Sequence, residues 1–549
     1  MFALGPHSKL SLAHFSQLIH SGLAMGISSE AVSRLEETRF FIDYLLKKNI
    51  KVYGLTTGFA DLRDEVVPPE KAAELSCNII ASHDAGIGAS LPSDVILGAM
   101  IVRANSLSKG FSGFQVSSLE TLVSMINARI IPEIPCHGSL GASGDLALLA
   151  RLGQAMQGRN VPVTYRGKKV SAKEALQQAG ITAFVPKAKE GLALTNGTSF
   201  MASMCALGFL KEIHLLENLF ALLPLFLEAT GAVDAAFYSS IQTCRNQKGQ
   251  QLVASILMDL LKESPLIDRA GVQDDYCIRC LPQILGPKLE MILESVNRIE
   301  NELEAVTDNP LIFRGEEISG DVNQEVLLNF QGSNWLVASG GNFHGEYLTT
   351  VADTIALANA KIVLLLERHM TYLLNPFRNK QKLPAYLIHD ESKRGLHSGH
   401  MVTQYTGNDI AQKICYLGNP TGLYNITSAN ESEDVVSYGS AACQRLLAQT
   451  ALFEDFLAIY LCIVAQAYSM RRIPARTHSE HCFELIQAHL PPLPSVKEES
   501  FTQRYESAKE LLHSKKLREL INFPLMKQIS REHVPDYQVH ADEMHVMPV

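Results

Sequence analysis

Hydrophobic side chains recur along most of this chain with the spacing of amphipathic helices. The clearest example is 288–306, where the leucines, isoleucines and valines share one face, while Glu290, Glu294 and Arg298 follow one another at i, i+4 spacing on another. Pro310 disfavours helical backbone at the residue before it and so ends this segment. The same periodicity predicts further helices at residues 29–48, 95–107, 117–128, 146–156, 345–374, 401–417 and 440–469.

Segments with a strand-like pattern are few and short. Residues 50–53 are predicted to be a strand, and residues 130–135, interrupted by prolines, are predicted to be extended. Residues 161–170 carry Arg166-Gly167 between two β-prone runs, which predicts a surface hairpin. A charged, solvated helix is predicted for 497–516. We therefore expect a mainly α protein.

The composition is that of an ordinary globular protein, with 46% hydrophobic and 19% charged residues among 549. A formal net charge of -9 argues against sequence-independent binding to nucleic acid, which needs a basic face. The first 23 residues lack the apolar core of a signal peptide, and the apolar stretch 456–470 is shorter than the roughly 20 residues of a membrane span. We expect a cytoplasmic protein that binds neither nucleic acid nor membrane.

Ten scattered cysteines are too dilute for a disulfide scaffold and suit a reducing compartment. Cys277 and Cys280 have CxxC spacing, but no second CxxC and no close pair of histidines completes a zinc site. We therefore expect buried structural cysteines and no metal.

The most distinctive stretch is Gly138-Ser-Leu-Gly-Ala-Ser-Gly-Asp145, whose glycines allow backbone conformations that a Cβ would forbid. It is not a phosphate-binding P-loop, because it lacks a lysine, and it is not a hydrolase nucleophile elbow, because the second glycine of GxSxG is misplaced. An Ala-Ser-Gly tripeptide in a tight turn can instead cyclise. The amide nitrogen of Gly144 can attack the carbonyl carbon of Ala142, and loss of water from the ring and from Ser143 leaves an exocyclic methylidene. The chain would thus supply its own electrophile.

Two side chains elsewhere are candidates by position alone. Tyr53 lies at a predicted strand-to-loop junction, where a side chain can face a cleft. His83 directly precedes an acidic residue in a glycine-containing segment, and its imidazole can change charge near neutral pH. Taken alone, a half-buried tyrosine and a structural histidine are the simpler interpretations.

Seven strings together resemble the aromatic amino acid ammonia-lyase and aminomutase family, and histidine ammonia-lyases most of all. Besides the loop and Tyr53-Gly-x-x-Thr-Gly-Phe, they are Glu190-Gly-Leu-Ala-Leu-Thr-Asn-Gly-Thr, Val272-Gln-Asp-Asp-Tyr-Cys-Ile-Arg-Cys, Thr307-Asp-Asn-Pro, Gly340-Gly-Asn-Phe-His and Thr427-Ser-Ala-Asn. They occur in the family's order and span nearly the whole chain, which makes the resemblance highly specific.

The resemblance implies a single catalytic unit over residues 1–549. A smaller mixed N-terminal lobe, 1–200, would carry the loop, and a long central and C-terminal helical bundle would follow in 201–549. Family members usually form a homotetramer whose active sites draw residues from more than one subunit. The implied cofactor is 4-methylideneimidazol-5-one, formed autocatalytically from Ala142, Ser143 and Gly144, with no external cofactor.

The resemblance also assigns roles to side chains. The substrate amine would add to the methylidene carbon, and a base would then remove a weakly acidic β-proton. Tyr53 matches the family's base, which needs nearby positive charge or hydrogen bonds that favour phenolate. Arg279 matches the residue that pairs with the substrate carboxylate, a bidentate task suited to guanidinium. Positions that orient the substrate and the cofactor ring, or pack beside the ring, are matched by Asn196, Gln273, Tyr276 and Phe343.

Ser82-His83 occupies the position that separates substrate preferences in the family and resembles the histidine enzymes, whereas tyrosine enzymes tend to carry His-Leu and phenylalanine enzymes Phe-Leu. An imidazole ring needs hydrogen-bonding partners, which His83 and Glu433 could supply. Elimination of ammonia from L-histidine to give trans-urocanate is therefore the leading expectation. The alternatives are a tyrosine or phenylalanine ammonia-lyase, a 2,3-aminomutase, or a non-catalytic relative; the intact 142–144, Tyr53 and Arg279 speak against the last.

The sequence departs from the histidine-enzyme pattern in three places, one of which is the segment 418–425. The segment 428–434 is one residue longer, so the carboxylate facing the substrate is either Glu433 or Glu431. We favour Glu433, because Glu433-Asp434 keeps the family's acidic pair just ahead of Val436-Ser437. Residues 320–337 resemble an insertion.

Overall fold

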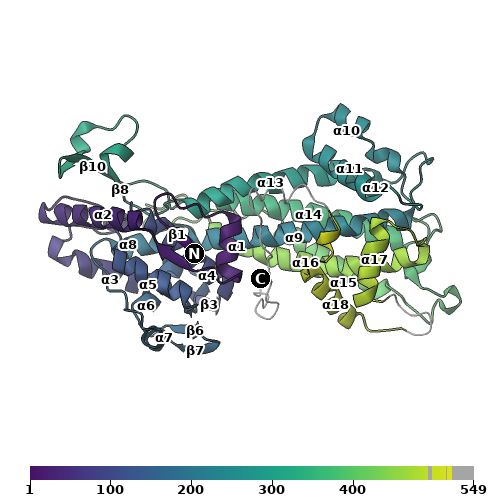
Figure 1. Ribbon diagram of the computed structural model, residues 1–549, viewed down its shortest axis with the longest axis horizontal. Coiled ribbons are helices and arrows are strands. Elements are labelled where there is room, and N and C mark those ends of the chain that lie inside the picture. Colours follow the sequence, from purple (N-terminus) through teal and green to yellow (C-terminus); the bar gives the residue numbers. More distant parts are fainter. Residues whose placement is uncertain (492–497, 515, 522–549) are drawn as a thin grey trace.

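The computed structural model describes residues 1–491, 498–514 and 516–521. A long helical bundle forms most of the molecule, and a smaller lobe with short strands lies at one end of it (Figure 1). The bundle's fully buried helix begins at Ser199, and the division of the chain near residue 200 stays a prediction. The mainly α prediction is confirmed.

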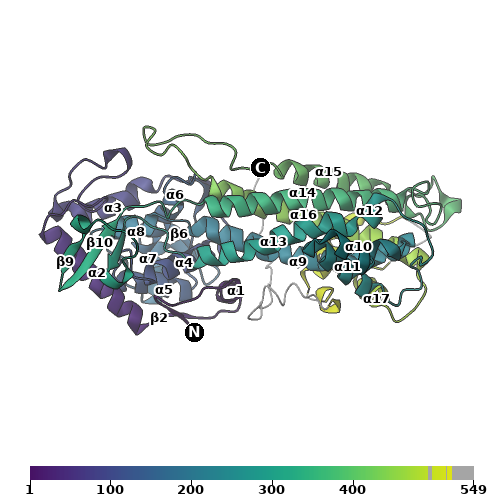
Figure 2. The ribbon, with the colours of Figure 1, turned by 90° about the horizontal axis from the view of Figure 1, so that it is seen from above.

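The bundle is built around α9 (Ser199–Thr230), every residue of which is buried. Helix α16 (Gly439–Arg471) packs along α9, and α14 (Glu346–Leu374) packs against α16. Helices α13 (Leu281–Glu304) and α15 (Met401–Leu417) lie against α14 from two sides, as the two orthogonal views show (Figures 1 and 2).

Three of these helices, α9, α14 and α16, are long and apolar enough to cross a membrane by length and composition. In the structure their most apolar 18-residue windows are 100%, 67% and 72% buried against the rest of the protein. The apolar stretch 456–470 is the C-terminal half of the helix predicted at 440–469, which is observed from Gly439 to Arg471, and most of its side chains are buried. The apolar side chains of α9, α14 and α16 pack against one another within the bundle.

The N-terminal lobe consists mainly of helices around a hydrophobic core that continues into the bundle, and a second, smaller core lies between α2 and the segment that carries Trp335. They are α2 (Ser29–Lys47), α3 (Ala72–His83), α4 (Ser93–Ser108), α5 (Val116–Asn127), α6 (Leu146–Met156), α7 (Ala172–Ala179) and α8 (Glu190–Thr195). The remaining helices are α1 (Leu12–His20), α10 (Ser239–Arg245), α11 (Lys248–Leu260), α12 (Tyr276–Arg279), α17 (His478–His489) and α18 (Phe501–His513).

Several short sheets brace the lobe. Strand β3 (Ile87–Ser90) pairs antiparallel with β5 (Pro135–His137), and β4 (Ile131–Pro132) joins the hairpin of β6 (Pro162–Tyr165) and β7 (Lys168–Ser171). The predicted hairpin and the extended 130–135 segment are thus confirmed. Strand β1 (Phe2–Leu4) pairs parallel with β2 (Met25–Ile27).

The predicted strand at residues 50–53 is wrong. Residues 50–52 are irregular and Tyr53 begins a turn, because the Thr56 hydroxyl accepts a hydrogen bond from the amide of Val52 at 2.8 Å and donates one to the carbonyl of Ile50 at 2.8 Å. Local side-chain bonds of this kind replace the bonds of a strand ladder. Tyr53 therefore lies in a turn.

The segment that resembled an insertion belongs to a three-stranded sheet of β8 (Leu311–Arg314), β10 (Ser333–Ala338) and β9 (Leu328–Phe330). Trp335 of this sheet stacks on Phe41 of α2 with ring centroids 4.5 Å apart. The predicted charged helix at 497–516 is observed as α18, and Lys497 and Lys515 lie outside the described residues.

Candidate active site

The loop Gly138–Asp145 connects β5 to the start of α6 and folds back on itself, with Gly141 bridged to Gly144. Ser143 has a φ of 55° and Gly144 a φ of 80°, both in the left-handed region. A Cβ at Gly144 would lie 2.1 Å from the carbonyl oxygen of Gly197, so only glycine fits there. The tight turn on which the cyclisation hypothesis depends is present.

Hydrogen bonds from the segment before α9 hold this loop in place. The Ser143 carbonyl accepts from the Gly197 amide at 3.2 Å and from Asn196 Nδ2 at 3.1 Å. Asp145 is fully buried and accepts from the first amides of α9, Phe200 at 2.8 Å and Met201 at 3.0 Å. Burial raises the pKa of Asp145 to about 7, against the opposing effect of these hydrogen bonds.

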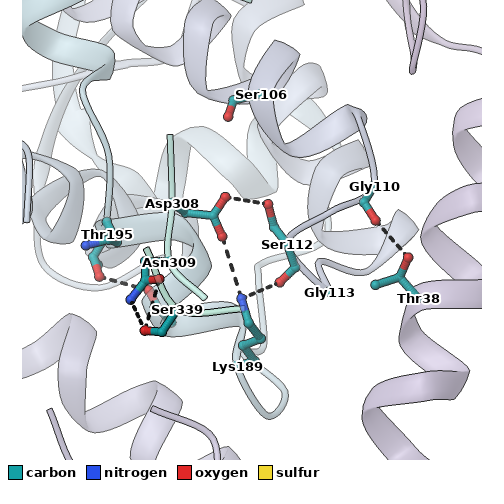
Figure 3. A network of polar contacts seen from close by, with 12 residues as sticks. Thr38, Ser106, Gly110, Ser112, Gly113, Lys189, Thr195, Asp308, Asn309 and Ser339 are labelled. Atoms are coloured by element: carbon teal, nitrogen blue, oxygen red, sulfur yellow. Dashed lines mark hydrogen bonds and ion pairs between the residues drawn. The ribbon is translucent and has the colours of Figure 1, made fainter. Parts of the chain in front are cut away.

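A buried polar network supports the 196–197 segment, and Figure 3 shows its part around Asp308, Ser112 and Lys189. Arg103 donates to the carbonyl of Asn196 at 2.8 Å and lies 3.8 Å from Asp308. The other Asp308 oxygen lies 3.6 Å from Lys189 Nζ, and Ser112 donates to this carboxylate at 2.7 Å. Because the ions of this network are completely buried, their positions are fixed by one another.

The loop forms one wall of a cavity of about 340 Å³. Of the predicted site residues, those that line it are Tyr53, Ala142, Ser143, Asn196, Phe343 and Glu433. Gly144 lies behind this lining, against Gly197. These side chains come from the N-terminal lobe, the start of α9, and the segments preceding α14 and α16.

Tyr53 lies in the cavity wall with its hydroxyl oxygen accepting from the amide of Ala60 at 3.0 Å. Burial raises the pKa of this phenol, and the charge of Glu433 raises it further. The Ala60 hydrogen bond and the charge of Arg63 act in the opposite direction. The positive charge that a phenolate base needs is therefore only partly provided by the predicted residues.

Glu433 lies directly opposite the loop. One carboxylate oxygen accepts from the Ser143 hydroxyl at 3.4 Å and the other from Ser428 at 2.8 Å. Residues 429–431 all have positive φ values, and this turn absorbs the extra residue while bringing Ser428 opposite Glu433. Glu431 is exposed and does not line the cavity.

His83 ends α3 just outside the cavity lining. Its Nδ1 is 3.0 Å from the Ser82 hydroxyl, and its ring meets the edge of Phe59, which in turn packs against Tyr53. Burial lowers the pKa of His83, and the charge of Glu433 opposes this shift. A neutral imidazole can both donate and accept a hydrogen bond.

Gln273, Tyr276 and Arg279 do not join this cavity within one chain. Helix α12 lies at the end of the bundle far from the lobe that carries α6 (Figures 1 and 2). Gln273 is exposed, the Tyr276 side chain is 69% exposed, and the Arg279 guanidinium lies 4.7 Å from the Tyr276 ring centroid. Nε of Arg279 is buried and has no hydrogen-bond partner among the described residues.

Further residues that the sequence analysis did not select line the cavity: Arg63, Asn309, Ser339, His344 and Asp434. Asn309 and His344 belong to matched strings and so could have been found, whereas Arg63 follows the Tyr53 string without any motif of its own. Over the described residues, no group of three or more His, Cys, Asp or Glu side chains is arranged to hold a metal ion.

The sequence matches a family described as aromatic amino acid lyase over residues 10–488. A histidine ammonia-lyase of Alkaliphilus metalliredigens is 36% identical over 461 residues, which cover 83% of this chain and 86% of the relative. One of Symbiobacterium thermophilum is 33% identical over 94% of this chain and 97% of its own length. The structure of histidine ammonia-lyase from Trypanosoma cruzi matches with a TM-score of 0.82 at 28% identity and covers 96% of both chains. A phenylalanine aminomutase of Pantoea agglomerans shares the fold, with a TM-score of 0.85 at 24% identity over 94% of this chain and all of that one.

Proposed function

This chain belongs to the aromatic amino acid lyase family, and from that premise we propose that it eliminates ammonia from L-histidine to give trans-urocanate. The observation that carries the proposal is the cavity in which the Ala-Ser-Gly loop, Tyr53 and Glu433 meet, with His83 beside it. The histidine ammonia-lyases among its relatives support the choice of substrate.

We propose 4-methylideneimidazol-5-one, formed from Ala142, Ser143 and Gly144, as the prosthetic group. The folded-back loop, the glycine-only clearance at Gly144 and the fixed Ser143 carbonyl fit a ring at this point of the chain. Such a group supplies an electrophilic carbon that makes the substrate's amine a better leaving group. Asn196 and Gly197 would hold it, and Phe343 would pack beside it.

The chain's own side chains would orient the substrate and move its proton. Tyr53, as phenolate, would take the β-proton, since its oxygen is already held in the cavity wall by the Ala60 amide. Glu433 would accept a hydrogen bond from a substrate imidazole N–H, and neutral His83 would bind the same ring from the side of α3.

We propose that a homotetramer completes the site, with Gln273, Tyr276 and Arg279 contributed by another copy of this chain. Two observations support this. Arg279 carries a buried Nε without a partner, and large apolar side chains stand exposed along one side of the bundle, among them Tyr347, Leu357, Leu364, Val402, Tyr405 and Tyr416. Exposed apolar surface of this extent is typical of a protein interface.

We place the enzyme in the cytoplasm. All ten cysteines are unpaired, which agrees with a reducing compartment.

A panel of amino acids tests the reaction and the substrate together. The purified protein is offered histidine, tyrosine and phenylalanine while ammonia, absorbance of the conjugated acid and β-amino acid are measured. Histidine should give ammonia and urocanate in equal amounts with no β-amino acid. A preference for tyrosine or phenylalanine would refute the substrate, and a β-amino acid product would identify an aminomutase instead.

A further inference from the structure

Arg63 brings a positive charge into the active-site cavity from an unexpected place. Among the described residues that line the cavity it is the only lysine or arginine, and it shares the lining with the carboxylates Glu433 and Asp434 and with His344. Arg63 directly follows a short 3-10 turn, Ala60–Leu62, whose first amide donates to the Tyr53 hydroxyl. The base and this cation are therefore positioned by the same turn.

The acidic neighbours of Arg63 on its own loop are engaged elsewhere. Asp61 accepts from Asn430 at 2.6 Å, and Asp64 lies 3.3 Å from Lys51 Nζ. Over the described part of the chain Arg63 forms no ion pair, and its side chain is exposed and belongs to the cavity lining. Its charge is thus free to act on groups inside the cavity.

Ionisation of Tyr53 needs such a charge. Burial and Glu433 both disfavour the phenolate. Burial also lowers the pKa of His83, so the neutral imidazole supplies no compensating charge. In the proposed assembly, Arg279 of another copy is committed to the substrate carboxylate. Arg63 is the cation that remains.

We propose that Arg63 is a positioning residue of this lyase, whose positive charge favours the ionised form of the Tyr53 hydroxyl. This inference rests on the proposed function, in which Tyr53 is the base. A guanidinium at the cavity mouth acts through the Tyr53 oxygen and need not touch the substrate.

The test compares Arg63→Gln, which removes the charge, with Arg63→Lys, which keeps it. Lys51→Gln is the matched control, because it removes a positive charge two residues before Tyr53 from a side chain outside the cavity lining. Two readouts are used for each variant: the pH dependence of kcat/KM for histidine, and the tyrosinate absorbance of Tyr53, obtained by subtracting a matching Tyr53→Phe protein.

In Arg63→Gln, both the acidic limb of the kcat/KM profile and the Tyr53 titration midpoint should move to higher pH by about half a unit to one unit, as expected of an exposed neighbouring charge. KM at the optimal pH should stay near the wild-type value. In Arg63→Lys and in Lys51→Gln, the acidic limb and the Tyr53 titration midpoint should stay at the wild-type pH.

If Arg63→Gln left both the acidic limb of the kcat/KM profile and the Tyr53 titration midpoint at the wild-type pH, the inference would be overturned. A raised KM with an unshifted acidic limb would also overturn it, because Arg63 would then be a substrate-binding residue. The absorbance titration needs no turnover. If the wild-type protein released no ammonia from any amino acid, the proposed function would fail, while the Tyr53 midpoint would still decide the role of Arg63.

Discussion

The loop at residues 138–145 and helix α12 carry the two halves of the proposed site, and they are built in opposite ways. Backbone bonds to the start of α9 hold the loop, and a completely buried network of Arg103, Lys189 and Asp308 supports it. Helix α12 has four residues, an exposed tyrosine and an arginine nitrogen without a partner.

The difference shows where each half finds its partners. The constraints on the loop all come from its own chain. They come from the N-terminal lobe, from α9 and from the segment before α16, where the Tyr438 amide donates to the Leu140 carbonyl at 3.1 Å. Among the described residues, the buried Nε of Arg279 has no hydrogen-bond partner, which is costly for a buried polar group. We infer that another copy of the chain supplies what α12 lacks.

The largest effect should come from Ser143→Ala in the self-contained half. The fold should be kept, since the Ser143 side chain makes only a 3.4 Å contact with Glu433. Ammonia release should fall at least about 1,000-fold, or about 4 kcal/mol in the barrier, because no electrophile can form. Substantial residual release, with the circular dichroism spectrum unchanged, would rule out the proposed cofactor.

Asp308→Ala should affect stability rather than chemistry first. It leaves Lys189 and Arg103 buried without their carboxylate, which should cost about 3–5 kcal/mol of unfolding free energy. Asp409→Ala is the matched control, because it breaks the exposed pair with Lys413 and should cost about 0.5 kcal/mol or less. Thermal unfolding of both variants measures the contrast, and equal losses would mean that the buried network does not support the loop.

Arg279→Ala tests the incomplete half. Loss of a bidentate bond to the substrate carboxylate should cost about 2–3 kcal/mol, seen as a drop of roughly 30- to 150-fold in kcat/KM. Arg279→Lys should recover only part of this loss, because an ammonium lacks the planar fork of donors. Steady-state kinetics with histidine measure both variants.

Mixtures of two variants test whether the loop and α12 of one active site come from different copies of the chain. Refolded mixtures of Ser143→Ala and Arg279→Ala chains should regain activity, because some sites would combine an intact loop with an intact arginine from another copy. Mixtures of Ser143→Ala and Tyr53→Phe should remain inactive, since both residues line the cavity of one chain. Equal behaviour of the two mixtures would contradict a site shared between copies.

The same contrast explains how far the sequence could predict the molecule. Helical periodicity was sufficient for α13 and the other long helices, and the glycine spacing of the loop reflects a steric demand that is local to the chain. The strand predicted at 50–53 does not form, because the Thr56 hydroxyl forms hydrogen bonds with the Val52 amide and the Ile50 carbonyl. Local pattern carries no information on such competition.

The position of α12 could not be predicted, because it depends on how α13 and α14 pack far from the loop. Of Glu433 and Glu431, only Glu433 lines the cavity, and its role toward the substrate stays a prediction. Residues 429–431 have positive φ values that turn Glu433 toward the cavity, and the residue types at these positions do not indicate such a turn. Arg63 likewise belongs to no motif.

His83→Leu should change the ranking of substrates within the self-contained half. A hydrogen bond to the substrate imidazole worth about 1.5–2 kcal/mol would be lost, so kcat/KM for histidine should fall roughly 10- to 30-fold. Turnover of phenylalanine should change far less, because its ring forms no such bond. Kinetics with both substrates measure this, and an unchanged ranking would show that His83 does not select the substrate.

The smallest effect concerns how α12 is held by the bundle. His369 of α14 donates through Nε2 to the Cys277 carbonyl at 2.8 Å and accepts at Nδ1 from the Tyr460 hydroxyl at 3.0 Å, so the neutral imidazole satisfies both partners. Burial lowers the pKa of His369 to about 3, below the ordinary value of 6.5 that it regains on unfolding. The unfolded chain therefore binds the proton more readily, and the contribution of His369 to stability is complete above pH 6.5 and declines as the pH falls toward 3.

His369→Gln keeps one donor and one acceptor but cannot titrate. Its deficit in unfolding free energy relative to the wild type should therefore narrow below pH 6.5, by at most about 1.4 kcal/mol per pH unit. Denaturant unfolding at fixed chain concentration between pH 7 and pH 4.5 measures the deficit. Burial also lowers the pKa values of His214, to about 4, and of His400, to about 3, but both residues are present in each protein, so their effect cancels in the difference. A deficit independent of pH would mean that His369 is not kept neutral by the fold, and that α12 is anchored to the bundle by something other than this hydrogen bond.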